Sequence, residues 1–319
     1  MRSFVIVFAL LVAGTLCAHA DSQPFHAGIT RVAVHDIVPF DALIAYPTDA
    51  AEVPFQAGPF TIAASRDVPI ASGTPFPIVL FSHGNGRGGG SSLVHRDLIT
   101  SLARQGYIVV APFHPGTSRP LVDRPRQIHK ALNIVLTDQR FAPHADPARV
   151  AMIGFSFGGA VALIVAGAVP NPAHLSAYCR NRTNDPRACD GVPADSPPSD
   201  TIIGKSADVL PLKGIVLMEP FGALFDQNGL RSVEMPVLLY RAEQSDLAAE
   251  GNILALAAGL PRPPRQQITP GGHFIFVDPC PALVETAAPA ACKDAAGVDR
   301  VAIHQRIEAE IATFLQQNL

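Results

Sequence analysis

The chain alternates short, continuous apolar runs with longer segments in which apolar residues recur every three or four positions. The continuous runs, typical of strands buried on both faces of a parallel sheet, occur at residues 77–82, 107–111, 150–153, 214–218, 237–240 and 266–269. Helical spacing is found between them, after Ser92 and Gly158 and at residues 126–141, 248–258 and 301–315. This alternation predicts an α/β fold, in which helices cover both faces of a mostly parallel sheet.

Three regions depart from this alternation. Residues 29–37 and 42–46 each precede a proline and predict two opening strands, paired as a hairpin at the edge of the sheet. Residues 54–77 are rich in Pro, Gly and Ser and predict a loop. Residues 170–211 are rich in Pro, Asp, Ser and Asn, which predicts an insertion over the sheet, either a partial lid or a disordered surface loop. We expect a single domain over residues 21–319.

The N-terminus has the pattern of a secretory signal peptide. Arg2 precedes an apolar run at residues 4–12, and a small-residue cleavage site ends at Ala20. We therefore expect residues 1–20 to be removed and the protein to be secreted or periplasmic. Leu16 stands where a lipid-attachment site before Cys17 would need a small residue, and no later run approaches the ~20 apolar residues of a membrane span. We expect no stable membrane anchor.

Composition narrows the classes of partner. The 319 residues include 24 basic and 27 acidic side chains, for a formal net charge of −3. No run of Lys and Arg is present to neutralise phosphates, and no alternation of aromatic and basic residues suggests a surface on which bases stack. We therefore expect no nucleic-acid partner.

Four cysteines remain after the signal peptide, namely Cys179, Cys189, Cys280 and Cys292. An even number in an oxidising compartment predicts disulfides. Sequence alone does not fix the pairing, but closeness in the chain favours Cys179–Cys189 and Cys280–Cys292, each worth about 3 kcal/mol in the chain-entropy model. Zinc is the competing interpretation, and the absence of C-x2-C spacing or a nearby histidine pair speaks against it. We expect no metal.

The strongest chemical motif is the pentapeptide GFSFG at residues 154–158. It matches G-x-S-x-G, in which the serine lies on a sharp, strained turn between a strand and a helix. Its context fits, because an apolar run precedes it and small residues follow. A side chain at Gly154 or Gly158 would collide across so tight a turn. The motif predicts Ser156 as a nucleophile.

A serine hydroxyl needs a base to remove its proton, and the base needs an acid that orients it. His273 follows the last predicted strand and is the candidate base. Asp246, after the strand at residues 237–240, is the favoured acid. Glu219, directly after residues 214–218, is the alternative, and Glu243 is a weaker one. The order Ser, acid, His along the chain is that of α/β-hydrolases.

The remaining candidates concern the oxyanion and the substrate. The N–H groups of Phe157 and of Asn85, in the glycine-rich loop at residues 83–90, are the candidate oxyanion donors. We expect His83, in the same loop, to be structural. Four aromatic residues near strand ends are candidates for an apolar substrate pocket, with plain core packing as the alternative: Phe113, Phe155, Phe221 and Phe274.

At these motifs the chain resembles the α/β-hydrolase superfamily, and more specifically dienelactone-hydrolase-like proteins and plasma-type platelet-activating-factor acetylhydrolases. The resemblance covers roughly residues 35–319 and rests on LFSHG at residues 80–84, GFSFGG at 154–159, and GHFIF at 272–276 followed by Pro279 and Cys280. It implies the α/β-hydrolase fold and a serine esterase acting on small or short-acyl esters.

Two departures from these families matter. Dienelactone hydrolases have a cysteine at the position of Ser156. The acetylhydrolases take their acid after the strand that corresponds to residues 214–218, which keeps Glu219 as the alternative acid, although the aligned position could be Met218, which cannot serve.

These residues together suggest an exported serine esterase that works through an acyl-enzyme on Ser156 and needs no cofactor. Two alternatives stay open at this point. One is amide or peptide hydrolysis by the same triad, and the other is a non-catalytic exported binding protein that retains the fold.

Overall fold

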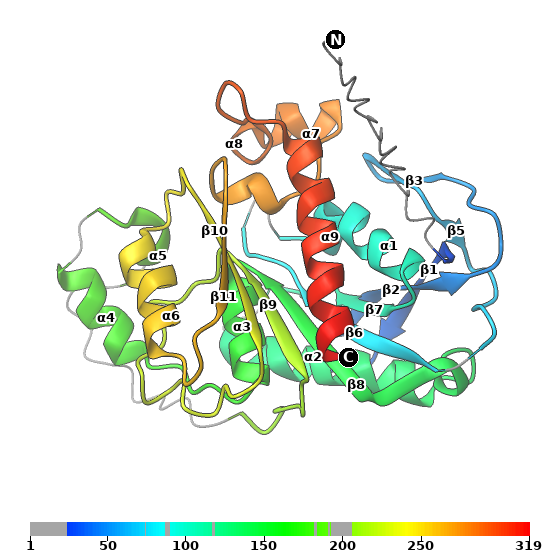
Figure 1. Cartoon of the computed structure of the whole chain (residues 1–319), viewed down its shortest axis with the longest axis horizontal. Coiled ribbons are helices and arrows are strands. Elements are labelled where there is room, and N and C mark those ends of the chain that lie inside the picture. Colours follow the sequence, from blue (N-terminus) through cyan, green and yellow to red (C-terminus); the bar gives the residue numbers. More distant parts are fainter. Residues whose placement is uncertain are drawn as a thin grey trace, which may run out of the picture.

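The computed structural model describes residues 24–73, 75–86, 90–116, 119–181, 184–190, 192 and 206–319. The predicted signal peptide, residues 1–20, therefore lies outside the described residues. A nine-stranded sheet forms the centre of the molecule, with the strands in the order β11-β10-β9-β8-β6-β7-β2-β1-β5 (Figure 1). In chain order its strands are β1 (His26–Val34), β2 (Phe40–Thr48), β5 (Ser65–Arg66), β6 (Phe76–Ser82), β7 (Ile108–Pro112), β8 (Ala145–Phe155), β9 (Gly214–Met218), β10 (Val237–Ala242) and β11 (Arg265–Thr269).

The sheet is mostly parallel, as the apolar runs predict. The six strands from β11 to β7 pair in parallel, whereas β2 runs antiparallel to both β7 and β1. The opening hairpin is confirmed, but β5 pairs outside β1, so the hairpin is not the extreme edge. The predicted loop at residues 54–77 also contains β3 (Phe55–Ala57) and β4 (Phe60–Ile62), a separate two-stranded sheet. Two or three residues are too few to show an alternating pattern.

Helices flank both faces of the sheet because successive strand residues point to opposite sides. Leu80 of β6 packs in one buried cluster with α2 (Pro120–Thr137), α3 (Phe157–Val165) and α6 (Ala255–Gly259). Its neighbour Phe81 packs in a second cluster with α1 (Arg96–Arg104) and α9 (Arg300–Asn318). Figure 1 shows α9, in red, crossing in front of the sheet. The helix expected at residues 126–141 begins earlier, at Pro120, where proline suits the first turn.

The insertion at residues 170–211 contains ordered structure. It forms α4 (Pro172–Asn181) and α5 (Pro186–Cys189), joined by the predicted disulfide Cys179–Cys189. Residues 182–183, 191 and 193–205 of this region lie outside the described part. The second predicted disulfide, Cys280–Cys292, joins the start of the segment that holds α7 (Ala282–Ala287) to the end of α8 (Pro289–Cys292). Both pairings predicted from the sequence are confirmed.

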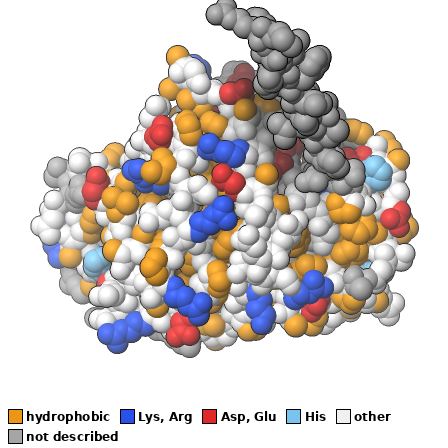
Figure 2. Space-filling model, viewed as in Figure 1, with side chains coloured by type: hydrophobic (Ala, Val, Ile, Leu, Met, Phe, Trp, Pro, Cys, Tyr) orange, Lys and Arg blue, Asp and Glu red, His pale blue; other side chains and the backbone are white. Residues whose placement is uncertain are grey.

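Basic, acidic and uncharged side chains are mixed on the surface. On the face drawn in Figure 2, Lys and Arg side chains are scattered among acidic and uncharged ones and form no continuous basic strip. Within the described residues, no helix combines the length and the apolar character that crossing a membrane requires.

Candidate active site

Ser156 occupies a strained corner between β8 and α3. Its φ of +54° is rare for a residue with a side chain and is stored strain of the kind found at functional sites. Three backbone hydrogen bonds hold the corner: Ser156 N–H donates to Met218 O at 2.9 Å, and Ser156 O accepts from Gly159 and Phe221 N–H at 2.9 and 3.1 Å. The neighbouring strand β9 therefore fixes the position of the serine.

The glycines on either side of Ser156 are needed for close backbone approach, as the sequence predicts. A Cβ atom on Gly158 would overlap the carbonyl oxygen of Ser82 in β6, and one on Gly154 would overlap the carbonyl oxygen of Gly158. Both obstacles are backbone atoms, which cannot swing aside as a side chain does. The helix α3 can therefore begin directly beneath the strand ends only with glycine at these two positions.

His273 lies within hydrogen-bonding distance of the serine. Its Nε2 atom is 3.0 Å from Ser156 Oγ, and its Nδ1 atom is 3.2 Å from Glu219 Oε2. The ring is buried, at 3 % exposure, in a 3-10 turn that follows β11. Because a carboxylate only accepts hydrogen bonds, the proton lies on Nδ1, which leaves Nε2 free to accept from the serine hydroxyl.

Glu219 is the carboxylate at the histidine. It follows β9, has a φ of +47° and is fully buried. Oε1 accepts from Ala242 N–H at 2.6 Å, and Oε2 accepts from the Ser245 hydroxyl at 2.5 Å as well as from His273. Three groups, one backbone N–H and two side chains, thus hold this carboxyl group in one orientation, which is the condition for a buried polar group to be tolerated.

The sequence favours Asp246 as the acid, but the structure places Glu219, and not Asp246, against His273. Asp246 has a side chain that is 55 % exposed and forms an ion pair with Arg187. Glu243 is exposed, and its backbone N–H donates to Thr269 O at 2.9 Å. Both residues follow the end of β10, whereas Glu219 directly follows β9, whose last residue, Met218, accepts from Ser156 N–H.

A cavity of about 680 Å³ opens beside Ser156. Its walls are mainly apolar. The part of the wall outside the insertion includes Phe157, Phe221, Leu224 and Leu247. The insertion supplies the opposite wall through Pro172, Leu175, Ala188, Asp190 and Val192. The insertion thus covers part of the cavity, as a partial lid would. Volumes of this order are typical of sites for small organic ligands.

Three of the four aromatic candidates do not line this cavity. Phe155 is fully buried, with its ring centre 5.1 Å from that of His273, so it packs against the histidine ring. Phe113 lies under the guanidinium of Arg31 in a separate cavity by β1 and β2. Phe221 does line the cavity and stacks on Phe157 at 6.4 Å. Phe155 and Phe113 pack with the second buried cluster, whereas Phe157 and Phe221 pack with the first, and a sequence position near a strand end does not reveal which face of the sheet a side chain takes.

Phe274, the fourth candidate, belongs to a smaller neighbouring depression that His273 also lines. Arg187 of α5 lies over its ring at 4.9 Å while pairing with Asp246. A second attachment is buried: Asp185 accepts from the Tyr178 hydroxyl at 2.7 Å and from Asn252 Nδ2 at 2.9 Å. These contacts hold the insertion against the domain.

The two candidate oxyanion donors border the cavity. Phe157 is the first residue of α3, and first-turn N–H groups have no partner inside their helix. Asn85 lines the same cavity from the glycine-rich loop. His83 donates from Nδ1 to Gly84 O at 2.8 Å and accepts from His114 N–H at 3.2 Å. Burial, with Arg124 nearby, lowers the pKa of His83 to about 3, so it is neutral and shapes the loop.

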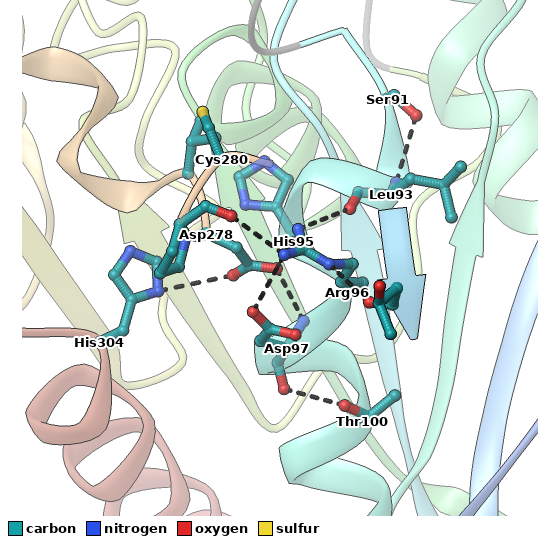
Figure 3. Close-up of polar contacts among 12 residues, drawn as sticks. Ser91, Leu93, His95, Arg96, Asp97, Thr100, Asp278, Cys280 and His304 are labelled. Carbon is teal, nitrogen blue, oxygen red and sulfur yellow. Dashed lines mark hydrogen bonds and ion pairs between the residues drawn. The ribbon is translucent and has the colours of Figure 1, made fainter. Parts of the chain in front are cut away.

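The turn that carries His273 is anchored by two other histidines. His95 Nδ1 lies 3.0 Å from Phe276 O, and His304 Nε2 lies 2.8 Å from Ile275 O. Burial alone would lower the pKa of His304, but the adjacent carboxylate of Asp278, 3.5 Å from Nδ1, raises it. Asp278 also accepts from Asp97 N–H at 2.7 Å, and Figure 3 shows His304 and Asp97 both in contact with its carboxylate. Sequence reasoning missed this cluster, because its members are far apart in the chain.

No group of three or more His, Cys, Asp and Glu side chains able to hold a metal ion occurs among the described residues. Neither the comparison with protein-family models nor that with curated proteins finds a match for this chain. The interpretation of the site therefore rests on its geometry and on the motifs in the sequence.

Proposed function

We propose that this protein is a serine hydrolase of the α/β-hydrolase fold that cleaves carboxylic esters. The observation that carries the proposal is a chain of two contacts: Ser156 Oγ lies 3.0 Å from His273 Nε2, and His273 Nδ1 lies 3.2 Å from Glu219 Oε2. A nucleophile, a base and an orienting acid in this order define a catalytic triad by geometry and role. The strained serine corner and the adjoining cavity add support.

The proposed reaction proceeds in two halves. Ser156 Oγ attacks the ester carbonyl carbon while His273 Nε2 takes its proton, and Glu219 stabilises the resulting imidazolium. The N–H groups of Phe157 and Asn85 receive the oxyanion. The tetrahedral intermediate collapses, the alcohol leaves with the proton from His273, and an acyl-enzyme remains. Water, activated by the same histidine, then releases the acid and restores the serine.

The experiment that tests the proposal is labelling with a fluorophosphonate, followed by intact-mass measurement and peptide mapping. We expect one adduct per chain, on Ser156, together with hydrolysis of p-nitrophenyl esters. A chain that hydrolyses no ester and forms no adduct would instead be a binding protein.

The cavity bears on the size of the substrate. The family resemblance implies small or short-acyl esters, whereas about 680 Å³ of mainly apolar space exceeds what an acetyl group fills. We propose that the acyl part is an apolar chain of medium length. Each methylene group buried contributes about 0.8 kcal/mol, or roughly fourfold in kcat/KM.

We therefore predict that kcat/KM rises from acetyl through butyryl to octanoyl p-nitrophenyl esters. Leu175→Trp, in the insertion wall, should move the optimum to shorter chains because it fills the cavity. The matched control is Leu254→Trp, since Leu254 is 44 % exposed and outside this lining. A preference for acetyl esters that Leu175→Trp leaves unchanged would rule out this use of the cavity.

We propose further that the protein is exported, in the secretory space or the periplasm. The two disulfides are compatible with an oxidising compartment. N-terminal sequencing of the mature protein, expressed with its own leader, should read from Asp21. Recovery of mature chains that still begin at Met1 would contradict this.

A further inference from the structure

Arg124 is a buried cation that the proposed mechanism does not yet use. It lies in the early part of α2 and is 5 % exposed. Its Nη1 atom donates to His83 O at 2.9 Å and to Gly84 O at 3.2 Å, and its Nη2 atom donates to Asn85 Oδ1 at 3.3 Å. Its guanidinium carbon is 5.0 Å from the ring centre of Phe157. One side chain therefore contacts both residues that carry the candidate oxyanion donors.

The partners of Arg124 are neutral. Its hydrogen bonds within the described residues all go to carbonyl oxygens, and no carboxylate there forms an ion pair with it. Burial lowers its pKa to about 10, so it keeps its charge at neutral pH. A buried charge without a counter-charge is unfavourable for folding. A negative charge would arise next to the two candidate donors when the carbonyl oxygen of a bound ester becomes an oxyanion.

The hydrogen bond to Gly84 O acts on the peptide group that carries the Asn85 N–H, one of the two candidate oxyanion donors. Gly84 C=O and Asn85 N–H belong to one planar peptide unit, and in a trans peptide they point in opposite directions. A donor that holds the carbonyl oxygen therefore fixes the direction of the N–H on the other side. It also polarises the unit, because hydrogen bonds in a chain strengthen one another. The neighbouring Gly86, with a φ of +71°, gives the loop little stiffness of its own.

We propose that Arg124 is a positioning residue for the oxyanion hole: it aims and polarises the Asn85 N–H, holds the Phe157 side chain, and supplies a fixed positive charge behind both donors. The inference rests on the proposed hydrolase function and deepens it. Arg124 touches neither the substrate nor Ser156 in this scheme. Its effect should therefore appear in stabilisation of the transition state and not in binding of the ground-state ester.

The test is a series of substitutions measured with p-nitrophenyl esters. Arg124→Gln should lower kcat about 100-fold with KM changed less than about threefold, the scale expected for a misdirected oxyanion donor. Arg124→Lys should recover only part of this loss, since an ammonium keeps the charge but cannot span two carbonyls and an amide. Added guanidinium should partly restore kcat in Arg124→Ala.

The matched control is Arg140, which also lies 5.0 Å from a phenylalanine ring but pairs with Asp138 on the surface. Arg140→Gln should leave kcat unchanged.

A trifluoromethyl ketone, which forms the oxyanion adduct, should bind Arg124→Gln about 100-fold more weakly. If folded Arg124→Lys and Arg124→Gln variants match the wild type in kcat and in this affinity, the inference is wrong while the hydrolase stands. If the wild-type chain hydrolyses no ester and forms no adduct, the proposed function itself fails.

Discussion

Ser156→Ala and His273→Ala should each lower kcat for ester hydrolysis by about 10⁴-fold or more, because each removes a member of a unit that acts together. Without Ser156 no acyl-enzyme can form, and without His273 the hydroxyl 3.0 Å away keeps its proton. The measurement is kcat with p-nitrophenyl esters, alongside the fluorophosphonate adduct, which Ser156→Ala should lack. The double variant should be no slower than the worse single variant.

The control for this pair is Ser232→Ala. Ser232 is exposed and precedes β10, at the end of the strand opposite to the active site. It should retain full activity. Ester hydrolysis at the wild-type rate by Ser156→Ala would remove Ser156 from the mechanism, whatever the other variants do.

Glu219→Gln should lower kcat about 10³- to 10⁴-fold, whereas Asp246→Asn should change it by less than about threefold. The amide of glutamine has nearly the shape of the carboxylate, but it cannot stabilise the imidazolium, and its NH₂ group favours the wrong tautomer of His273. Asp246→Asn removes only a half-exposed ion pair with Arg187, and such pairs contribute about 0–1 kcal/mol. The measurement is kcat for both variants on one ester.

Folding must be followed in the same experiment, because Glu219 also accepts from Ala242 N–H and from the Ser245 hydroxyl. Thermal unfolding shows whether Glu219→Gln is folded, and its Oε1 can keep the bond to Ala242. Glu219→Asp gives a second variant that retains the charge. A large loss of kcat in Asp246→Asn, with no loss in Glu219→Gln, would show that Asp246 is the acid.

The local parts of the site could be predicted from the sequence. The serine corner depends on a strand, a tight turn and small residues within about ten positions, and GFSFG displays all three. The disulfides join cysteines only 10 and 12 positions apart, so proximity in the chain was a sound guide. His273 is predictable from the sequence because it follows the last strand, β11, by only a few residues.

The carboxylate that contacts His273 could not be predicted from residues that are close in the chain. Asp246 and Glu219 both follow strands between the serine and the histidine, and the sequence contains no measure of their distance from Nδ1. In the folded sheet β9 lies between β8 and β10, so the residue that leaves β9 emerges beside the serine corner. Asp246 comes four positions after the end of β10 and turns toward α5 of the insertion.

The sequence by itself therefore determined the alternation of strands and helices, the candidate nucleophile, the candidate base and the disulfides, because each depends on residues that are neighbours in the chain. The tertiary structure alone decided the partner of His273, the wall that the insertion adds to the cavity, and the place of Arg124 behind the glycine-rich loop. Each of these depends on which strand ends and helices meet in space. The strained turn at Ser156 combines both, since its glycines are visible in the sequence and the backbone atoms that require them belong partly to β6.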